Sequence, residues 1–314
     1  RFQQRAWEDA SRIDLSLQRD KQGSLTRQPL RFDLKQHVDG NHSFMFMAET
    51  APLSSDPAFL LLPVDQQQRY ELGWQHRGDN HEEALQLTQL DSLENVTGLR
   101  ARASTNLPAG FSLEGRAGWR QYSNLTSGLI VGGMRDYAGF TLGWAVDGRN
   151  LLALESEYNM LSAQDGGALG KVFTNSLTYS YRLFSGERDW LVKTGVSNTS
   201  SSAETVLPTI LLPLVPPGLA ATPAFFVPES YTQFSLALAF GDNAEQNYQR
   251  GWRSFWDIGL TQDAQTGLGY DYRIGILGRV LGRDRLRFFI SGDEGAQGNG
   301  EKTQLLNADY RLFY

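Results

Sequence analysis

Apolar and polar residues alternate along most of this chain. In the segment 30–36 (LRFDLKQ), Leu30, Phe32 and Leu34 alternate with the charged residues Arg31, Asp33 and Lys35. Successive side chains of a β-strand point to opposite faces, so this period of two predicts strands with one apolar and one polar face. The clearest strands are predicted at residues 12–18, 30–36, 69–76, 111–122, 151–160, 171–183, 267–277 and 285–291. Weaker alternation predicts further strands near residues 42–50, 84–90, 98–105, 137–146, 190–198, 231–240 and 255–262.

The chain ends in one more strand, residues 306–314 (LNADYRLFY), with Leu306, Tyr310 and Tyr314 on one face. An exposed apolar edge strand invites aggregation, so a soluble protein rarely ends in this way. In a closed barrel, the last strand pairs with the first. The ending resembles the C-terminal signal of bacterial outer-membrane β-barrels, a terminal aromatic residue with apolar or aromatic residues two and four places earlier. A soluble β-sandwich has the same period and is the alternative, but the terminal aromatic residue favours the barrel.

The predicted strands number about sixteen, and most approach the roughly 9 to 11 residues that a tilted transmembrane strand needs. An even number brings both chain ends to the periplasmic side, and a barrel of this size encloses an aqueous channel. The sequence therefore predicts an all-β fold. Residues 12–314 are expected to form a transmembrane, antiparallel, up-and-down β-barrel in the bacterial outer membrane.

The connections between these strands alternate in length, which predicts the orientation of the barrel. Short turns rich in Gly, Asp and Asn, as tight hairpins require, are expected on the periplasmic side, at residues 38–41, 106–110, 147–150 and 185–189. The longer loops are expected outside the cell, at residues 51–68, 123–136, 199–230 and 292–301. Three connections fit less well: the periplasmic turns 77–83 and 241–251 are long, and the outer loop 91–97 is short.

The polar faces of the predicted strands carry acidic and basic residues in similar numbers. On the lipid face, an Arg or Lys at the membrane midplane would cost about 2–4 kcal/mol, so these side chains are expected to line a water-filled lumen. Many of them are expected to pair across neighbouring strands, so they predict no ion selectivity. The predicted lumen residues are Asp14, Arg31, Asp33, Lys35, Glu71, Arg100, Arg102, Glu114, Arg116, Arg120, Glu155, Glu157, Asp257, Asp271, Arg273, Arg287, Asp309 and Arg311.

Two predicted outer loops are unusually apolar and rich in proline. Residues 206–228 (VLPTILLPLVPPGLAATPAFFVP) contain too many prolines for a helix or a central strand, and residues 51–64 share this character. The loops follow roughly the third and eleventh strands, about half a circumference apart, so we expect them to meet across the mouth as a gate. Packing on the outer rim, against lipopolysaccharide or a neighbouring molecule, is the alternative. The predicted gate residues are Pro52, Phe59, Leu61, Pro208, Leu212, Pro216, Pro217 and Phe225.

Tryptophan and tyrosine residues lie near the ends of many predicted strands. Amphipathic rings at such positions contact lipid headgroups, so two aromatic belts are expected at the membrane interfaces. The predicted belt residues are Trp74, Trp119, Trp144, Trp190, Trp256, Tyr122, Tyr137 and Tyr231.

The composition gives no support to nucleic-acid binding or to transmembrane helices. The chain has 29 Lys and Arg against 35 Asp and Glu, a net charge of −6, and no basic block, so nucleic-acid binding has no support. No stretch approaches the roughly 18 to 20 apolar residues of a transmembrane helix. The absence of cysteine fits a chain exported through an oxidising periplasm.

Two candidate chemical sites have simpler explanations. Glu155 and Glu157 share a strand face about 7 Å apart, within the separation found in inverting glycosidases. They lack an apolar pocket that would raise one pKa, so lumen carboxylates are favoured. The histidines surround two neighbouring periplasmic turns, where a rim that contacts a partner protein is favoured over a metal site. They are His37, His42, His76 and His81. No phosphate-binding loop, zinc motif or Ser-His-Asp arrangement is found, so we expect no enzyme, cofactor or metal.

The barrel size, the segment 1–11, the C-terminal LNADYRLFY and the tryptophan-rich segment 251–256 together resemble the outer-membrane exporters of secreted exopolysaccharides. In that group, a periplasmic tetratricopeptide-repeat region precedes a C-terminal porin. The resemblance is to the PelB family, which exports the Pel biofilm polysaccharide. The exporters of poly-N-acetylglucosamine and of cellulose are the near alternatives. Residues 1–11 lack alternation, so we expect a helical lead-in from an upstream periplasmic region, beyond which an export signal has been removed.

This resemblance implies a pore that passes a partly deacetylated amino-sugar polymer from the periplasm to the cell surface. It also implies a lipoprotein ring like PelC at the periplasmic rim, a periplasmic modification enzyme held through the upstream region, and a synthase complex below. The barrel itself would contact outer-membrane lipid and lipopolysaccharide. A passive or substrate-specific diffusion porin for small solutes is the alternative function.

Overall fold

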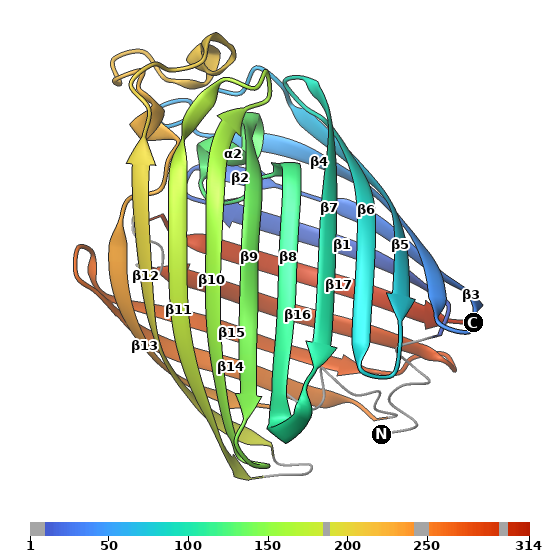
Figure 1. The fold of residues 1–314 in the computed structure, drawn as a ribbon. Helices are drawn as coiled ribbons and strands as arrows, with labels where there is room; N and C mark the ends of the chain where they lie inside the picture. The colour runs from blue at the N-terminus through green and yellow to red at the C-terminus, as the bar shows by residue number, and fades with distance from the viewer. Residues whose placement is uncertain (1–9, 185–188, 242–250, 295–300) are drawn as a thin grey trace.

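The computed structural model describes residues 10–184, 189–241, 251–294 and 301–314, and these form an antiparallel sheet that closes into a barrel (Figure 1). The helical lead-in expected at residues 1–11 falls mostly on residues 1–9, which lie outside the described residues. Ala10 forms a bend, Ser11 has no regular structure, and the first strand begins at Arg12.

Each predicted strand is present, and most are longer than predicted. The strands are β1 (Arg12–Gln22), β2 (Leu25–Arg27), β3 (Leu30–Asp39), β4 (His42–Ser55), β5 (Gln66–Arg77), β6 (His81–Asp91), β7 (Asn95–Asn106), β8 (Phe111–Tyr122), β9 (Gly133–Ala145), β10 (Asn150–Ala163), β11 (Ala168–Phe184), β12 (Trp190–Ala203), β13 (Tyr231–Phe240), β14 (Arg253–Asp263), β15 (Gly267–Gly278), β16 (Asp284–Glu294) and β17 (Thr303–Phe313). β2 and β3 are two parts of one strand, because both pair with β1 on one side and β4 on the other. The 17 strand segments therefore make the sixteen-stranded barrel that the sequence predicted.

The last strand pairs with the first. β17 runs antiparallel to β1 from Phe313 opposite Arg12 to Thr303 opposite Gln22. Beyond the strand, the backbone N–H of Tyr314 donates to the carbonyl of Ser11 over 3.1 Å. This pairing removes the two free edges that the sheet would otherwise expose. The C-terminal pattern thus predicted the closure of the barrel correctly.

The strand register collects the apolar residues on the outside of the barrel. Leu17, Leu236 and Leu260 are 61%, 56% and 55% exposed in the isolated chain, and each lies in a row of other exposed apolar side chains. A slip of one residue along a strand would turn every such side chain into the lumen. The need to keep the apolar face in lipid therefore fixes the register. An apolar outer face around a polar interior is the arrangement of a barrel that lies in lipid.

The two ends of the barrel differ in their connections. At one end, which we call the turn end, the connections include tight hairpins such as β3–β4, where Gly40 adopts a φ of +43°. In the β9–β10 turn, the backbone N–H groups of Arg149 and Asn150 donate to Asp147 over 2.7 and 2.8 Å and lower the pKa of its carboxyl. The opposite end, the loop end, carries the long connections 56–65, 123–132 and 204–230.

Several connections differ from the lengths expected. Because β5 extends to Arg77 and β6 begins at His81, the turn between them is short. Most of the predicted turns 185–189 and 241–251 lies outside the described residues, as does most of loop 292–301. Among the described residues, no helix is long and apolar enough to cross a membrane.

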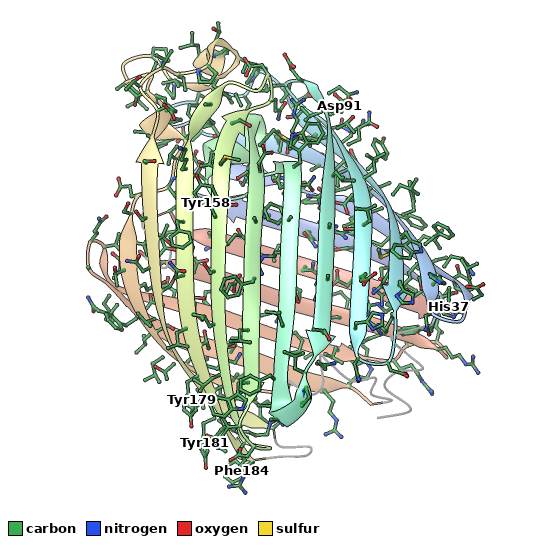
Figure 2. The ribbon with its side chains drawn as sticks, in the orientation of Figure 1. His37, Asp91, Tyr158, Tyr179, Tyr181 and Phe184 are labelled. Atoms are coloured by element: carbon green, nitrogen blue, oxygen red, sulfur yellow. The ribbon has the colours of Figure 1, made fainter. Side chains whose placement is uncertain are left out.

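Aromatic side chains gather on the outer face at the turn end. Trp190 contacts Phe240 and Trp256 with ring centroids 5.4 and 5.1 Å apart, and Phe111 stacks on Trp144 at 5.3 Å. Figure 2 shows Tyr179, Tyr181 and Phe184 at the same end. Together with Trp74 and Trp119 on the outer face, the five tryptophans predicted for the belts point away from the lumen.

The belt prediction was wrong for its three tyrosines. Tyr122 lies between the guanidinium groups of two lumen arginines, each 5.2 Å from its ring. Tyr137 lies under Arg135 at 4.8 Å, and Tyr231 is in register with Thr199 on the lumen side. Tyr137 and Tyr231 share the parity of the polar faces of their strands, and Tyr122 likewise has the parity of Glu114 and Arg116, although the register of β8 shifts before it.

Candidate functional site

The charged residues expected in the lumen lie, with one exception, on the face of their strands that points into the barrel. The strand register aligns each of them with the inward face except Arg120. Their outward neighbours on the same strands are largely the exposed apolar side chains described above. What the sequence did not show is how these charges are distributed, because they form separate networks.

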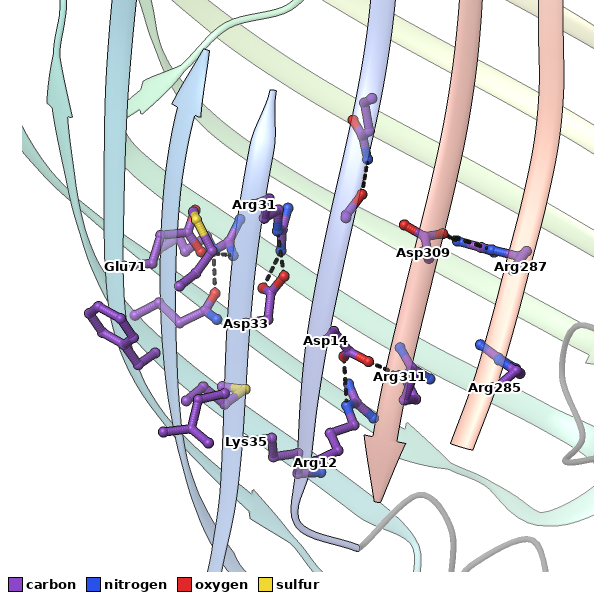
Figure 3. A pocket seen from close by; sticks show the side chains of 18 residues that line it. Arg12, Asp14, Arg31, Asp33, Lys35, Glu71, Arg285, Arg287, Asp309 and Arg311 are labelled. Atoms are coloured by element: carbon purple, nitrogen blue, oxygen red, sulfur yellow. Dashed lines mark hydrogen bonds and ion pairs between the residues drawn. The ribbon is translucent and has the colours of Figure 1, made fainter. Parts of the chain in front are cut away.

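The first network crosses the seam where the barrel closes, as Figure 3 shows. Asp14 accepts from Arg311 of the last strand and forms an ion pair with Arg12 at 3.1 Å. Next to it, Arg31 pairs with Asp33 at 2.6 Å and Arg287 pairs with Asp309 across β16 and β17. These pairs line a cavity of about 370 Å³ in the lumen, to which Lys35 and Glu71 also contribute. The seam therefore has polar contacts in addition to its backbone hydrogen bonds.

The second network lies nearer the loop end, on β2 to β7. Glu49 accepts from Arg27 at 3.0 Å and from Arg69 at 3.2 Å. Glu71 pairs with Arg100 at 2.6 Å and with Arg69 at 3.8 Å. The Tyr122 ring packs between Arg27 and Arg69, so this network also supports the start of the loop after β8.

The third network surrounds Arg116 of β8. Arg116 donates to both Glu155 and Glu157 of β10, and Arg135 approaches Glu157 at 3.2 Å. Both carboxylates thus accept hydrogen bonds from guanidinium groups in a polar wall. Elsewhere, Arg102 pairs with Glu114 at 2.7 Å and Lys193 with Asp257 at 2.6 Å.

Arg120 departs from the regular wall because β8 contains a bulge. The register with β9 shifts between Gly118 and Gln121, and Arg120 adopts a φ of +49°. Its backbone N–H donates to Asp136 and its guanidinium donates to the carbonyl of Gln164, both at 2.6 Å. Gly98 of β7 permits this bulge, because a Cβ there would lie 2.2 Å from the carbonyl oxygen of Arg120.

Sequence reasoning missed several members of these networks. They are Arg12, Arg27, Glu49, Arg69, Arg135 and Lys193. Glu49 shares its strand face with Met45 and Met47, so the polar side of β4 was hidden by apolar neighbours that also point inward. Strand parity alone, extended outward from the predicted strand centres, would have found Glu49 and Arg69.

Three long connections fill the mouth at the loop end with an apolar cluster, which we call the mouth cluster. Its fully buried members include Leu60 from the β4–β5 loop, Leu129 and Ile130 from the β8–β9 loop, and Leu214 and Phe226 from the β12–β13 loop. The β12–β13 loop holds two short 3₁₀ helices, η2 (Thr209–Leu214) and η3 (Pro223–Phe225), and the β8–β9 loop holds the helix α2 (Ser127–Gly132). Figure 1 shows α2 at the same end of the barrel as the long loop after β12.

Hydrogen bonds from around the circumference hold residues 125–132, which we call the α2 segment, in the mouth. Its backbone carbonyls accept from Gln22 of β1 at 3.3 Å, Gln67 of β5 at 2.8 Å and Gln164 of the β10–β11 connection at 3.0 Å. The hydroxyl of Thr126, which caps the helix, donates to the carbonyl of Phe226 at 2.7 Å. Because its partners come from opposite sides of the barrel, this segment lies across the lumen.

The two proline-rich loops contact each other, as the sequence predicted. The backbone N–H of Leu61 donates to the carbonyl of Leu214 over 3.0 Å. Of the predicted gate residues, the structure buries Pro216, half-buries Leu61, Pro208 and Phe225, and exposes Pro52, Phe59, Leu212 and Pro217. Pro52 lies in β4 and not in the loop. Residues next to the predicted ones, such as Leu60 and Leu214, are the buried ones, and α2, which the sequence did not single out, packs in the same cluster.

His42, His76 and His81 gather on the outer face at the turn end, whereas His37 has the parity of the inward face and lies 3.4 Å from the hydroxyl of Ser43. The ring centroids of His42 and His76 lie 4.8 Å apart, those of His76 and His81 lie 5.2 Å apart, and Trp74 stacks on His42 at 5.6 Å. Across the described ranges, no group of three or more His, Cys, Asp or Glu side chains is placed to hold a metal ion. The imidazoles extend the aromatic surface of the belt.

The chain was compared with families, curated proteins and solved structures. No match is found among curated proteins. A solved structure described as "Bacterial polysaccharide outer membrane secretin" aligns with a TM-score of 0.71 at 10% identity, over 98% of this chain and 99% of that chain. CdiB from Acinetobacter baumannii aligns with a TM-score of 0.49 at 8% identity, over 96% of this chain and 60% of that one. OpdL of Pseudomonas aeruginosa aligns with a TM-score of 0.46 at 12% identity, over 97% and 98%.

The likeness to the first of these structures establishes the fold, and a family model narrows the assignment further. The model described as the PelB C-terminal β-barrel domain matches residues 7–313. This match extends from before β1 to the last residue of β17, so it includes the seam, the lumen wall and the mouth cluster. The chain therefore belongs to the family of PelB C-terminal β-barrel domains.

Proposed function

We propose that this chain forms the outer-membrane pore through which a secreted exopolysaccharide, an amino-sugar polymer of the Pel type, passes from the periplasm to the cell surface. The observation that most directly supports this function is a charged lumen, within a barrel of the PelB family, whose outer mouth holds an apolar loop cluster. As an outer-membrane barrel, the chain contacts lipid through its apolar outer face.

The pore works as a conduit without chemistry. A hydrated glycan slides along polar groups that exchange hydrogen bonds with its own, and none of these contacts is strong enough to trap it. The driving force comes from synthesis on the inner side. The mouth cluster acts as a gate that closes the pore when no polymer is present, and the arriving chain displaces the loops that form it.

A passive diffusion porin for small solutes is the second candidate function. It requires a mouth that stays open. The α2 segment, hydrogen-bonded to β1, β5 and the β10–β11 connection, argues against this because it lies across the path of a solute. The seam cavity and the ion-pair networks are compatible with either function.

The turn end is the proposed docking surface for the periplasmic partners. The row of His42, Trp74 and His76 lies there on the outer face. A lipoprotein ring like PelC would surround this rim. A periplasmic modification enzyme would be held by a repeat region that precedes the helical lead-in.

Deletion of the gene, followed by an assay for secreted polysaccharide, tests the export function. We expect secretion to stop and to return when the full-length gene is supplied. The barrel expressed without its upstream region is expected to insert in the membrane but to restore less secretion, because the upstream region guides the polymer. Undiminished secretion in the deletion strain would contradict the proposal.

Deletion of residues 208–226 tests the gate. This change removes Leu211, Leu214 and Phe226 from the mouth cluster, and with Phe226 it removes the acceptor of the Thr126 hydroxyl. We expect the single-channel conductance to rise and bulky antibiotics to enter the cell. Cells with the same amount of the unaltered barrel are the control, and equal permeability in the two strains would argue against a gate.

A further inference from the structure

One side of the lumen carries small neutral side chains over the middle of its strands, and its charged residues, Arg182 and Lys193, lie nearer the turn end. β11, β12 and β13 form this side. The register places Thr178, Gly195 and Ser235 in one row across the three strands and Ser176 beside Ser197 in the adjacent row. We call these five residues the hydroxyl wall, and all of them are half-buried.

The hydroxyl groups of this wall are available to a ligand. Within the ranges that the structure describes, the side chains of Ser176, Thr178, Ser197 and Ser235 have no hydrogen-bond partner in the chain. Thr261, in register with Ser235 on the next strand, is 5% exposed, and its hydroxyl is likewise unpartnered. The charged networks differ in this respect, because their carboxylates already accept from arginine or lysine.

Gly195 shapes the middle of the wall. A Cβ at this position would lie 2.9 Å from the hydroxyl oxygen of Ser235 and 3.5 Å from that of Thr178. The glycine therefore leaves a shallow gap in the wall with a hydroxyl group on each side. A pyranose ring that approaches this gap finds donors and acceptors on both sides without displacing a side chain.

We propose that the hydroxyl wall is the track along which the exported glycan moves, and that it binds uncharged sugar hydroxyl groups. This inference rests on the proposed export function and adds which side of the lumen the polymer follows. A neutral hydrogen bond is roughly half as strong as one to a charged group, so contacts along this wall break easily as the chain advances. The opposite, charged side keeps its ion pairs and holds water.

The test removes hydroxyl groups without adding volume. The track variant combines Ser176→Ala, Thr178→Val and Ser235→Ala. The control variant combines Ser156→Ala, Thr194→Val and Ser254→Ala, which are the same substitutions at positions that face outward on β10, β12 and β14. The probe is an uncharged hexamer of N-acetylglucosamine, and its dissociation constant is measured with the purified full-length protein in detergent.

We expect the track variant to raise the dissociation constant of the hexamer by about tenfold, since it removes three neutral hydrogen bonds. Secretion by cells with equal amounts of barrel is expected to fall in parallel. The control variant is expected to behave like the wild type. The single change Thr178→Val, which keeps the side-chain shape, gives a smaller rise and serves if the triple variant assembles poorly.

The outcomes separate this inference from the export function. In one outcome, the wild-type gene restores secretion while the track variant binds the hexamer and secretes polymer as well as the control does. That result contradicts the proposed track and leaves the proposed export function intact. If the wild-type gene restores no secretion, the proposed function fails and the track fails with it. A loss that is equal in the track and control variants would also overturn the track.

Discussion

Single arginine side chains hold several carboxylates of the lumen wall at once. Arg116 contacts both Glu155 and Glu157, and Arg69 lies within reach of both Glu49 and Glu71. The Arg116–Glu155 pair is partly exposed to a wet lumen, where screening limits its contribution to stability to about 0–1 kcal/mol. Its main effect is therefore on the electrostatic field that a passing solute meets.

Replacing Arg116 with Gln tests this effect on the field. The change leaves Glu155 and Glu157 with Arg135 as the remaining cation of their network, so the lumen becomes more negative. We expect the reversal potential in a KCl gradient to shift in favour of K⁺ when measured in the 208–226 deletion, which supplies an open pore. Arg116→Lys, which keeps the charge, should restore the wild-type value. Arg149→Gln in the exposed β9–β10 turn is the control, and an equal shift there would contradict the assignment.

At the scale of elements, the short helix α2 depends on a glycine for its packing. A Cβ on Gly128 would lie 2.7 Å from Cδ1 and 3.0 Å from Cε1 of the Phe226 ring, which is fully buried. Thr126 caps the same helix and also donates to the carbonyl of Phe226. The helix and the β12–β13 loop therefore pack as one unit in the mouth cluster.

Gly128→Val is expected to loosen the mouth cluster without affecting the barrel. Overpacking of a buried site costs about 1–3 kcal/mol, and about 1.4 kcal/mol changes an equilibrium tenfold, so the open state becomes more populated. Cells with this variant should become more sensitive to a bulky antibiotic such as vancomycin. Gly115→Val on the outer face of β8, where nothing lies within 4 Å, is the matched control. Equal sensitivity of the two strains would show that Gly128 does not hold the mouth closed.

At the scale of the whole molecule, one closed sheet separates two environments. Adjacent residues of a strand face lipid and water in turn, so the same substitution has different effects at neighbouring positions. Leu236 points outward from β13, while Ala237 lies on the lumen side next to Lys193. This pair allows a direct comparison of the two faces.

Arginine substitutions at these two positions test the assignment of the faces. We expect Leu236→Arg to lower the free energy of unfolding by about 2–4 kcal/mol, because the guanidinium enters the hydrocarbon layer. Ala237→Arg places the same group in the lumen, where water solvates it, so its effect should be much smaller. Urea unfolding in phospholipid vesicles, followed by tryptophan fluorescence, measures both. A larger loss for Ala237→Arg would reverse the faces.

The sequence alone determined the strands, their closure and the two faces of the wall, because the period of two is a local property. The alternation within each strand indicates which of its residues face lipid. The pattern at residues 306–314 likewise required a first strand to pair with, and β1 supplies it. The local rule failed where the backbone departs from regular pleating, as at the bulge between Gly118 and Gln121, where Arg120 adopts a positive φ and Gln121 lies opposite the inward Arg135.

The tertiary structure alone decided what occupies the mouth. The sequence identified two apolar loops and their meeting, but it pointed to Phe59 and Leu212, which are exposed, and not to Leu60 and Leu214, which are buried. It also gave no sign that α2 packs in the same cluster. A loop has no hydrophobic periodicity from which its contacts could be predicted. Its position follows from contacts with strands on opposite sides of the barrel, and these come together only after the sheet has closed.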